Sequence, residues 1–213
     1  TRRSSDLDEP PIAYYTMDAP AGTEWRAASA WPLPKQNPTP FYFHGGPTGT
    51  VGSANDGDLK KQAAPAGHFA GQDDYTVDYS YSFGPINRWS NAYGMTPMTG
   101  YGDMTGRDAK GLTYTTDPLP ADVEVTGHPV VHLWVNSTAK DKDGDFFVVL
   151  EEVDENGISH YLTEGVLKAS HRAVRPNALY DKLGLPYHRS FKEDYAELTG
   201  QPVELVIDLL PIS

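Results

Sequence analysis

The chain has 213 residues, of which 38% are hydrophobic and 22% charged, and this is the composition of a globular protein that can bury a sizeable core. Its formal net charge is −12 and it contains no cysteine. The absence of cysteine excludes disulfides, thiolate zinc sites and cysteine nucleophiles. The acidic charge argues against nucleic acid and anionic membranes as partners, since both require a basic surface. We therefore expect a soluble protein, bacterial in character and either cytoplasmic or secreted.

Short β-prone runs, separated by turn residues, follow one another along the chain. The predicted strands cover residues 12–17, 41–44, 112–116, 123–126, 130–135, 146–153, 160–169 and 203–210. The best helical pattern is short and covers residues 190–198, where Phe191, Tyr195 and Leu198 recur at helical spacing. Two tracts rich in glycine, at 45–74 and 84–111, have little periodicity and are expected to form long loops.

The predicted strands 130–135 and 203–210 alternate clearly between their two faces, as strands with one buried face do. In the last strand, Val203, Leu205, Ile207 and Leu209 share one side. The dipeptide Asn156-Gly157 is a strong hairpin turn signal between two strands. The sequence therefore predicts a single all-β domain over residues 1–213, a β-sandwich with long loops and at most short helices.

An ordered set of short motifs resembles the C-terminal domain of the X-Pro dipeptidyl-peptidase and CocE/NonD hydrolases, a peptidase S15-like family that includes cocaine esterase and α-amino-acid ester hydrolases. The motifs are Glu24-Trp25-Arg26, Trp31-Pro32-Leu33-Pro34, Thr39-Pro40-Phe41-Tyr42-Phe43, Gly111-Leu112-Thr113-Tyr114-Thr115-Thr116-Asp117-Pro118-Leu119, Val123-Glu124-Val125-Thr126-Gly127, His132-Leu133-Trp134-Val135, Asp145-Phe146-Phe147-Val148-Val149-Leu150, Tyr187-His188-Arg189 and residues 202–211. The resemblance implies a jelly-roll, galactose-binding-domain-like sandwich. It also implies that this domain packs on an α/β-hydrolase domain, which carries the Ser-Asp-His triad of the parent protein.

The resemblance fails at the end of the chain. The family normally continues after the segment that corresponds to residues 208–211 into further strands, whereas this sequence ends at Ser213. We therefore expect a sandwich truncated before its last strands, with an open sheet edge that favours association.

No catalytic centre is predicted within the chain. Ser159 lies in Gly157-Ile158-Ser159-His160-Tyr161, which lacks the second glycine of a nucleophile elbow and follows a hairpin turn instead of preceding a helix. Neighbouring residues of a strand point to opposite faces, so neither Ser159 with His160 nor Glu151 with Glu152 forms a working pair.

One acidic run imitates a calcium loop. Asp141, Asp143 and Asp145 fall at alternate positions, and Glu152 follows eleven residues after Asp141. The loop requires glycine at its sixth position, where this chain has Phe146, and we interpret the run as a solvated turn that enters a strand. We expect neither a metal nor a cofactor.

The aromatic residues are the remaining candidates for a functional surface. The resemblance implies that Trp25 and Trp31 pack either against the catalytic domain or within the sandwich itself. Arg88, Trp89 and Tyr93 stand together in a predicted loop, where they form either the rim of the substrate pocket and a binding surface, or a cover over the domain.

Three functions remain open at this stage. The first is a non-catalytic accessory domain of a serine hydrolase, which packs on the α/β-hydrolase domain of the same protein and shapes its substrate pocket. The second is a free-standing carbohydrate-binding jelly roll, which requires a planar strip of exposed aromatic rings. The third is an oligomerisation module that forms a homo-oligomer through the unfinished sandwich.

Overall fold

The protein was analysed as a computed structural model, which describes residues 9–63, 71–80, 94, 101–138, 140, 142–179 and 183–213. The chain divides into two compact units. The first comprises Thr1–Asn37, Glu124–Leu150 and Thr163–Ser213, and the second comprises Pro38–Val123 and Glu151–Leu162. Strands dominate both units, so the prediction of an all-β protein is confirmed, while the jelly-roll connectivity stays a prediction.

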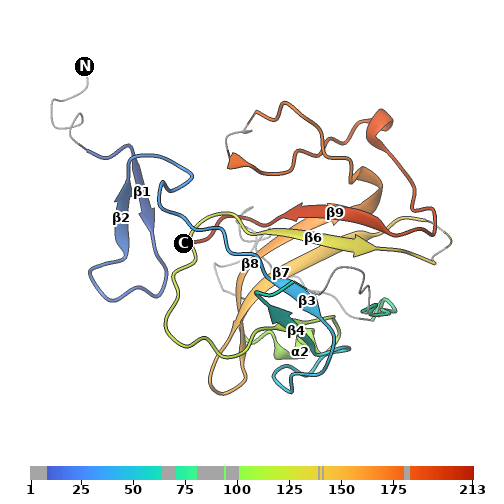
Figure 1. Cartoon of the computed structure of the whole chain (residues 1–213), viewed down its shortest axis with the longest axis horizontal. Helices are drawn as coiled ribbons and strands as arrows, with labels where there is room; N and C mark the ends of the chain where they lie inside the picture. Colours follow the sequence, from blue (N-terminus) through green and yellow to red (C-terminus); the bar gives the residue numbers. More distant parts are fainter. Residues whose placement is uncertain are drawn as a thin grey trace. The chain divides into compact units, whose positions relative to one another are not determined.

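The strands of the first unit begin with an antiparallel hairpin of β1 (Ile12–Tyr15) and β2 (Trp25–Ala28), labelled in Figure 1. A second antiparallel pair joins β6 (Val130–Val135) to β9 (Val203–Asp208), and Figure 1 shows these two strands side by side. Their register places Leu133 opposite Leu205 and Val131 opposite Ile207. The alternation predicted for both strands is thereby confirmed, because the odd-numbered residues of β9 are the buried ones.

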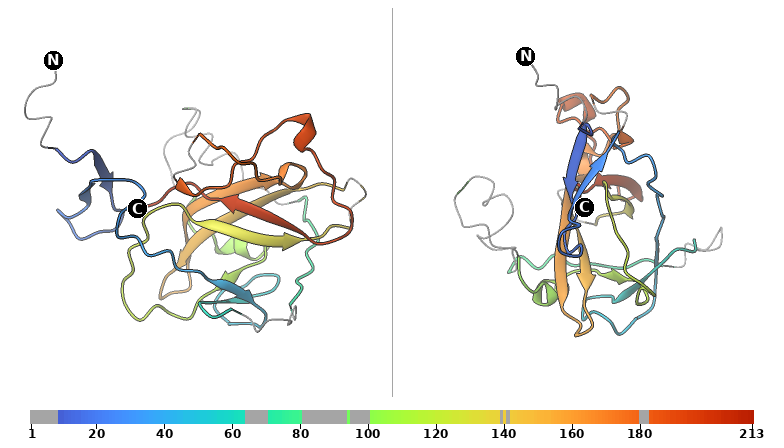
Figure 2. Two further views of the ribbon diagram at one scale, coloured as in Figure 1. Left: turned by 45° about the horizontal axis from the view of Figure 1, so that its top comes forward. Right: turned by 90° about the vertical axis from the view of Figure 1, so that its left-hand side faces the viewer.

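The longest hairpin joins β7 (Asp145–Val153) to β8 (Ser159–Lys168) and is visible in orange in both views of Figure 2. The predicted turn connects them. Gly157 adopts φ +77°, which glycine reaches without steric cost, and the Asp154 carboxylate accepts hydrogen bonds from the backbone N–H groups of Asn156 and Ile158. Residues 145–150 and 163–168 of the hairpin belong to the first unit, and its tip belongs to the second.

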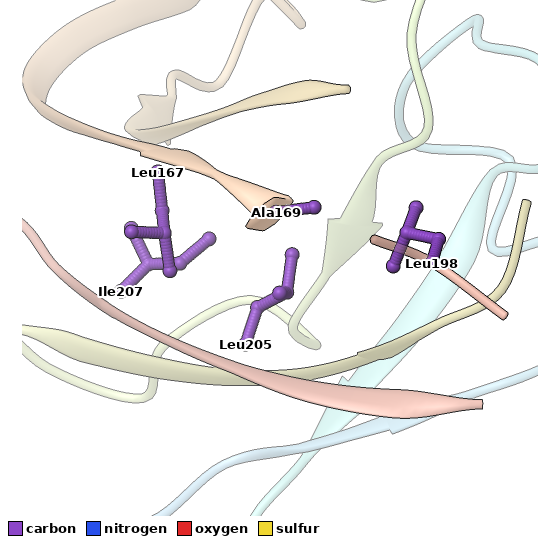
Figure 3. Packing of buried hydrophobic residues seen from close by; sticks show 5 residues of the cluster. All are labelled: Leu167, Ala169, Leu198, Leu205 and Ile207. Carbon is purple, nitrogen blue, oxygen red and sulfur yellow. The ribbon is translucent and has the colours of Figure 1, made fainter. Parts of the chain in front are cut away.

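The core of the first unit lies between β8 and β9. Leu167 of β8 and Ala169 of the following 3-10 turn (Ala169–His171) pack with Leu205 and Ile207 of β9, and Leu198 completes the cluster (Figure 3). The backbones of β8 and β9 approach closely at Gly165, where an added Cβ would lie 2.5 Å from the Asp208 carbonyl oxygen. Glycine is therefore required at this position.

The second unit holds a three-stranded sheet of β3 (Tyr42–His44), β4 (Gly57–Lys60) and β5 (Tyr114–Thr115). β4 pairs antiparallel with β3 and parallel with β5. Gly57 lies directly under the Tyr114 ring, which a Cβ would approach to 2.5 Å. The short helix α2 (Thr105–Asp108) precedes β5 in the chain. No helix in the described part of the chain is long and apolar enough to cross a membrane.

Three local predictions differ from the structure. The stretch 123–126 forms no strand, and its valines are more than half exposed. The stretch 190–198 is not an α-helix and contains only a 3-10 turn, Lys192–Asp194, because the Asp194 side chain is buried against Arg175 and Arg189. The two tracts expected to be loops, 45–74 and 84–111, contain β4 and the short helix α2 (Thr105–Asp108) respectively.

Candidate interdomain surface

The two tryptophans predicted to pack at a domain interface have different environments. Trp25, the first residue of β2, is 72% exposed, and its only described aromatic neighbour is Tyr15, whose ring lies 5.4 Å away at 76°. Trp31 is half-buried and meets the edges of Tyr14 and His128 at 6.1 Å and 6.4 Å within its own unit. Trp31 therefore packs inside the first unit, whereas Trp25 presents its ring to solvent.

Trp25 belongs to a small apolar surface that we call the hairpin surface, formed by Tyr15 and Trp25, with the exposed Met17 two residues further along the chain. Tyr15 and Trp25 are directly paired across the strands, so their side chains share one face of the hairpin. Both Tyr15 and Met17 are about half exposed, at 48% and 50%. Large apolar side chains gathered in this way are typical of a surface that another protein part covers.

The loop end of the hairpin and its second strand contact other parts of the first unit. The Met17 N–H donates to the Ser213 carbonyl at 2.9 Å, and Arg26 forms an ion pair with Glu124 at 2.6 Å. The Thr16 N–H donates to the Glu24 carbonyl at 2.8 Å and extends the pairing of the two strands. The hairpin surface is therefore presented on a fixed support, which reduces the conformational entropy that docking would cost.

The residues predicted for the pocket rim, Arg88, Trp89 and Tyr93, lie outside the described residues, as does Asp141 of the acidic run. The other two members of that run are engaged by protein groups. Asp143 accepts backbone N–H groups of Gly144 and Ser170, both at 2.9 Å, and Asp143 and Asp145 lie 3.3 Å and 3.7 Å from the Lys168 ammonium.

These contacts determine the charge state of Asp143. Burial acts to raise the pKa of Asp143, but the hydrogen bonds from Ser170 and Gly144 and the Lys168 ammonium outweigh it, and the pKa lies below its usual value. Asp143 thus serves to fix the entry of β7 against Lys168 and Ser170. Within the described ranges, no group of three or more histidine and carboxylate side chains is arranged to hold a metal ion.

The adjacent residues Ser159 and His160 have separate partners. Ser159 is fully buried and its hydroxyl donates to Asp108 at 2.5 Å, while the exposed His160 ring lies 3.1 Å from Asp154. Ser170 and His171 do touch, with Oγ and Nδ1 3.2 Å apart. The Ser170 side chain is fully buried, so its oxygen cannot reach a substrate.

Sequence reasoning missed one cluster of polar side chains, formed by Asp108, Glu151 and Ser159. Asp108 is only 6% exposed, although it carries a carboxyl group, and burial together with the nearby charge of Asp108 raises the pKa of Glu151 to about 8. Asp108 and Ser159 are 51 positions apart, so no local pattern connects them. Only the pairing of chain segments in the folded unit brings these groups together.

A shallow cavity of about 300 Å³ lies in the first unit. Its walls are mostly apolar and come from three stretches of chain; they are formed by His128, Leu183, Leu185, Asp208, Leu209, Leu210 and Pro211. The described residues that line it include no serine or threonine.

Comparison with known proteins covers almost the entire chain. A family described as the X-Pro dipeptidyl-peptidase C-terminal non-catalytic domain matches residues 7–213. A putative serine esterase of Mycobacterium tuberculosis (strain CDC 1551 / Oshkosh) is 36% identical over 206 residues, which are 96% of this chain and 30% of the relative. A putative serine esterase of Mycobacterium bovis (strain ATCC BAA-935 / AF2122/97) matches to the same extent.

The cocaine esterase of Rhodococcus sp. (strain MB1 Bresler) is more distant. It is 29% identical over 171 residues, which cover 77% of this chain and 28% of that enzyme. The chain thus spans less than a third of the length of each of these relatives. The resemblance inferred from the sequence motifs is confirmed.

Proposed function

The chain belongs to the family of X-Pro dipeptidyl-peptidase C-terminal non-catalytic domains, and from this premise we propose that it is the accessory domain of a serine hydrolase and packs on the catalytic part of that protein. The expected partner is an α/β-hydrolase domain, which supplies the serine, histidine and carboxylate of an acyl-transfer mechanism. Esters and X-Pro peptides are the two substrate classes that the relatives' names and the family description suggest.

The exposure of the hairpin surface is the observation that carries this proposal. A tryptophan that is 72% exposed, on a hairpin hydrogen-bonded at its loop end to Ser213, is the kind of residue that dominates binding energy when a partner covers it. The relatives contain more than twice as much chain outside the matched region as within it, and that additional chain is the occupant we propose.

We further propose that the tract containing Arg88, Trp89 and Tyr93 faces the substrate pocket of the catalytic part. Under the proposal this tract contributes specificity to the parent enzyme, and neither of the two adjacent Ser-His pairs of the described chain supplies a nucleophile, since Ser159 and Ser170 are both fully buried. In the assembled parent protein, Trp89→Ala should change KM for the substrate while leaving the urea midpoint of this domain unaltered. An unchanged KM for ester and X-Pro substrates alike would contradict a role at the rim.

A carbohydrate-binding role is not favoured by the described aromatic residues. Sugar rings stack on flat aromatic platforms, whereas the rings of Tyr15 and Trp25 are inclined at 76°. The rings of Tyr101 and Tyr161 pack against each other at 4.4 Å and are inclined at 58°, so they form no flat platform either.

The packing proposal is tested by producing the catalytic part of the parent protein separately and measuring its binding to the 213-residue chain by titration calorimetry. Trp25→Ala should weaken binding by at least tenfold, because loss of a tryptophan at the hot spot of an interface costs about 2 kcal/mol or more. Trp134→Ala is the matched control, because Trp134 is 66% exposed on β6 and lies outside the hairpin surface.

Each outcome decides one part of the proposal. Binding that depends on Trp25 and not on Trp134 supports the hairpin surface as the interface. Binding that is equally tight in both variants would place the interface elsewhere, and failure of the unaltered chain to bind would refute the packing itself.

A further inference from the structure

One stretch of the second unit has the sequence pattern of a strand with a buried face, yet it lies open to solvent. Within residues 71–80, Tyr75, Val77 and Tyr79 recur at alternate positions and are separated by polar residues. Strict alternation of this kind is typical of a strand that buries one face. In the structure, however, Val77 is 54% and Tyr79 92% exposed, and the stretch belongs to no helix or strand. We call residues 71–80 the strap.

The strap is attached to the second unit by polar side chains. The Asp73 carboxylate accepts hydrogen bonds from the Tyr114 hydroxyl at 2.6 Å and from the Asn55 amide at 3.2 Å. Further along, the Tyr75 hydroxyl donates to the Lys110 carbonyl at 2.8 Å. All of these groups belong to the second unit, so the position of the strap within that unit is defined.

Lys110 also holds the far end of the strap. Its ammonium lies 3.2 Å from the Asp78 carboxylate, which accepts hydrogen bonds from the Ser80 hydroxyl and backbone N–H. These hydrogen bonds, with the Lys110 ammonium, lower the pKa of Asp78 to about 2, so the ion pair persists at neutral pH. Val77 and Tyr79 take no part in these attachments and are left as exposed apolar groups of the strap.

Attachment through polar groups leaves the apolar side chains available to a partner. A tyrosine ring offers a large apolar area and loses little conformational entropy on binding. Because the strap is already positioned by Asp73, Tyr75 and Asp78, its docking costs less entropy than the ordering of a free loop. The strap therefore has the properties of a contact surface for another protein part.

The charge of the strap favours a partner that differs from this chain. The strap contains three aspartates and no lysine or arginine, and the whole chain has a formal net charge of −12. Two copies joined through the strap would bring like charges together, which opposes association. A complementary partner presents an apolar strip with basic groups beside it.

The remainder of the parent protein is the available partner. The relatives contain more than twice as much chain outside the matched region as within it. The strap also precedes the tract that contains Arg88 and Trp89, which we propose to face the substrate pocket. Nine positions separate Tyr79 from Arg88, and a chain of that length spans at most about 32 Å. If both face the catalytic part, their contact regions on it lie within that span.

We propose that the strap docks through Val77 and Tyr79 on an apolar strip of the catalytic part of the parent protein, with basic groups of that part beside the carboxylates of the strap. This contact rests on the proposed packing of the domain and is separate from the hairpin surface. It fixes one end of the tract that contains Arg88 and Trp89, and thereby positions the rim of the substrate pocket.

Hydroxyl-radical footprinting of the isolated 213-residue chain and of the assembled parent protein tests the strap directly. Tyr79 is 92% exposed and should be oxidised rapidly in the isolated chain. In the parent its oxidation rate should fall at least about fivefold, because an aromatic ring in the core of an interface is excluded from solvent. Trp25 reports on the hairpin surface in the same sample, and Trp134 serves as the exposed reference.

The footprint separates failure of the strap from failure of the proposed packing. Protection of Tyr79 in the parent supports the strap. Protection of Trp25 without protection of Tyr79 refutes the strap and leaves the packing intact, whereas protection of neither refutes both. Slow oxidation of Tyr79 in the dilute isolated chain means that the chain covers the strap itself, and protection that appears only as the concentration of the isolated chain rises identifies a second copy as the occupant. Either of these last two results overturns the proposal.

A paired substitution gives a second test with a matched control. The double variant Val77→Ser/Tyr79→Ser should weaken binding to the catalytic part, measured by titration calorimetry, by at least about tenfold, because interface tyrosines are frequent hot spots. Its urea midpoint should stay unchanged, since both side chains are exposed. Leu119→Ser removes a side chain of the same unit that is 56% exposed and lies outside the strap, and this variant should bind as the unaltered chain does. Equal binding of the double variant and the unaltered chain, or equal weakening in Leu119→Ser, would contradict the proposal.

Discussion

Replacing Glu151 by glutamine should make the protein more stable at neutral pH, and the gain should vanish in acid. The pKa of Glu151 is about 8 in the folded chain and near 4.5 in a solvated one, chiefly because burial and the nearby Asp108 disfavour its charged form. At neutral pH the folded chain therefore binds a proton that the unfolded chain has released. The stability that this proton confers is complete below about pH 4.5 and is lost progressively as the pH rises to about 8.

The size of the effect follows from the pKa difference. Each pH unit in this window changes the free energy of unfolding by up to about 1.4 kcal/mol. Between pH 4.5 and pH 7 the unaltered chain therefore loses roughly 3 kcal/mol of stability through Glu151. This value is an upper limit, because the Glu151 side chain is only partly buried. Glutamine mimics the protonated acid and does not titrate, so Glu151→Gln should avoid that loss.

Urea unfolding followed by circular dichroism at pH 5, 6, 7 and 8 measures this directly. The difference in free energy of unfolding between Glu151→Gln and the unaltered chain should grow with each step in pH. Glu152→Gln, in which an exposed carboxylate is changed, should track the unaltered chain. A difference that is the same at pH 5 and pH 8 would refute the raised pKa of Glu151.

Three further substitutions test the packing of the first unit by urea unfolding. Gly165→Ala should cost about 1–3 kcal/mol, because its Cβ would overlap the backbone of β9, whereas Gly52→Ala, with no atom within 4 Å of the added carbon, should be nearly neutral. Trp31→Ala should cost about 1–3 kcal/mol in the isolated chain through lost ring contacts, whereas Trp25→Ala should change its stability by less than about 0.5 kcal/mol. Asp194→Asn should lower the urea midpoint, because the fully buried carboxylate binds two arginine side chains; equal midpoints would show that these ion pairs do not stabilise the fold.

The positions of several strands could be predicted, because a strand with one buried face alternates between apolar and polar residues along the sequence. This applies to β6 and β9, whose apolar positions pair across the sheet as Leu133 with Leu205. β4 was missed because the segment Gly57–Lys60 contains one apolar side chain, and its place in the sheet depends on the contact between Gly57 and Tyr114. Such a segment is a strand only in its tertiary context.

The helix predicted over 190–198 failed for a related reason. Its periodic apolar residues compete with Asp194, whose side chain turns inward to Arg175 and Arg189. The ion pairs fix this stretch as an irregular segment with one 3-10 turn. Propensity and spacing give no sign of partners that are distant in the sequence.

The candidate site was predictable in part. The sequence motifs identified Trp25 and Trp31 as packing residues, but their spacing gave no way to separate the exposed ring from the half-buried one. That difference arises from the register of β1 and β2, which aligns Trp25 with Tyr15 on an open face. The carboxyl pair of Asp108 and Glu151 had no signal at all, because each residue is unremarkable in its own segment.

The measurement that tests the central claim most directly is labelling of the 213-residue chain with a fluorophosphonate probe for serine hydrolases, together with an assay on an activated ester. An accessory domain whose catalytic serine lies elsewhere in its parent should show no labelling and no turnover, while the assembled parent shows both. Stoichiometric labelling of the isolated chain, mapped to any of its serines, would contradict the account and show that the domain carries a catalytic centre of its own.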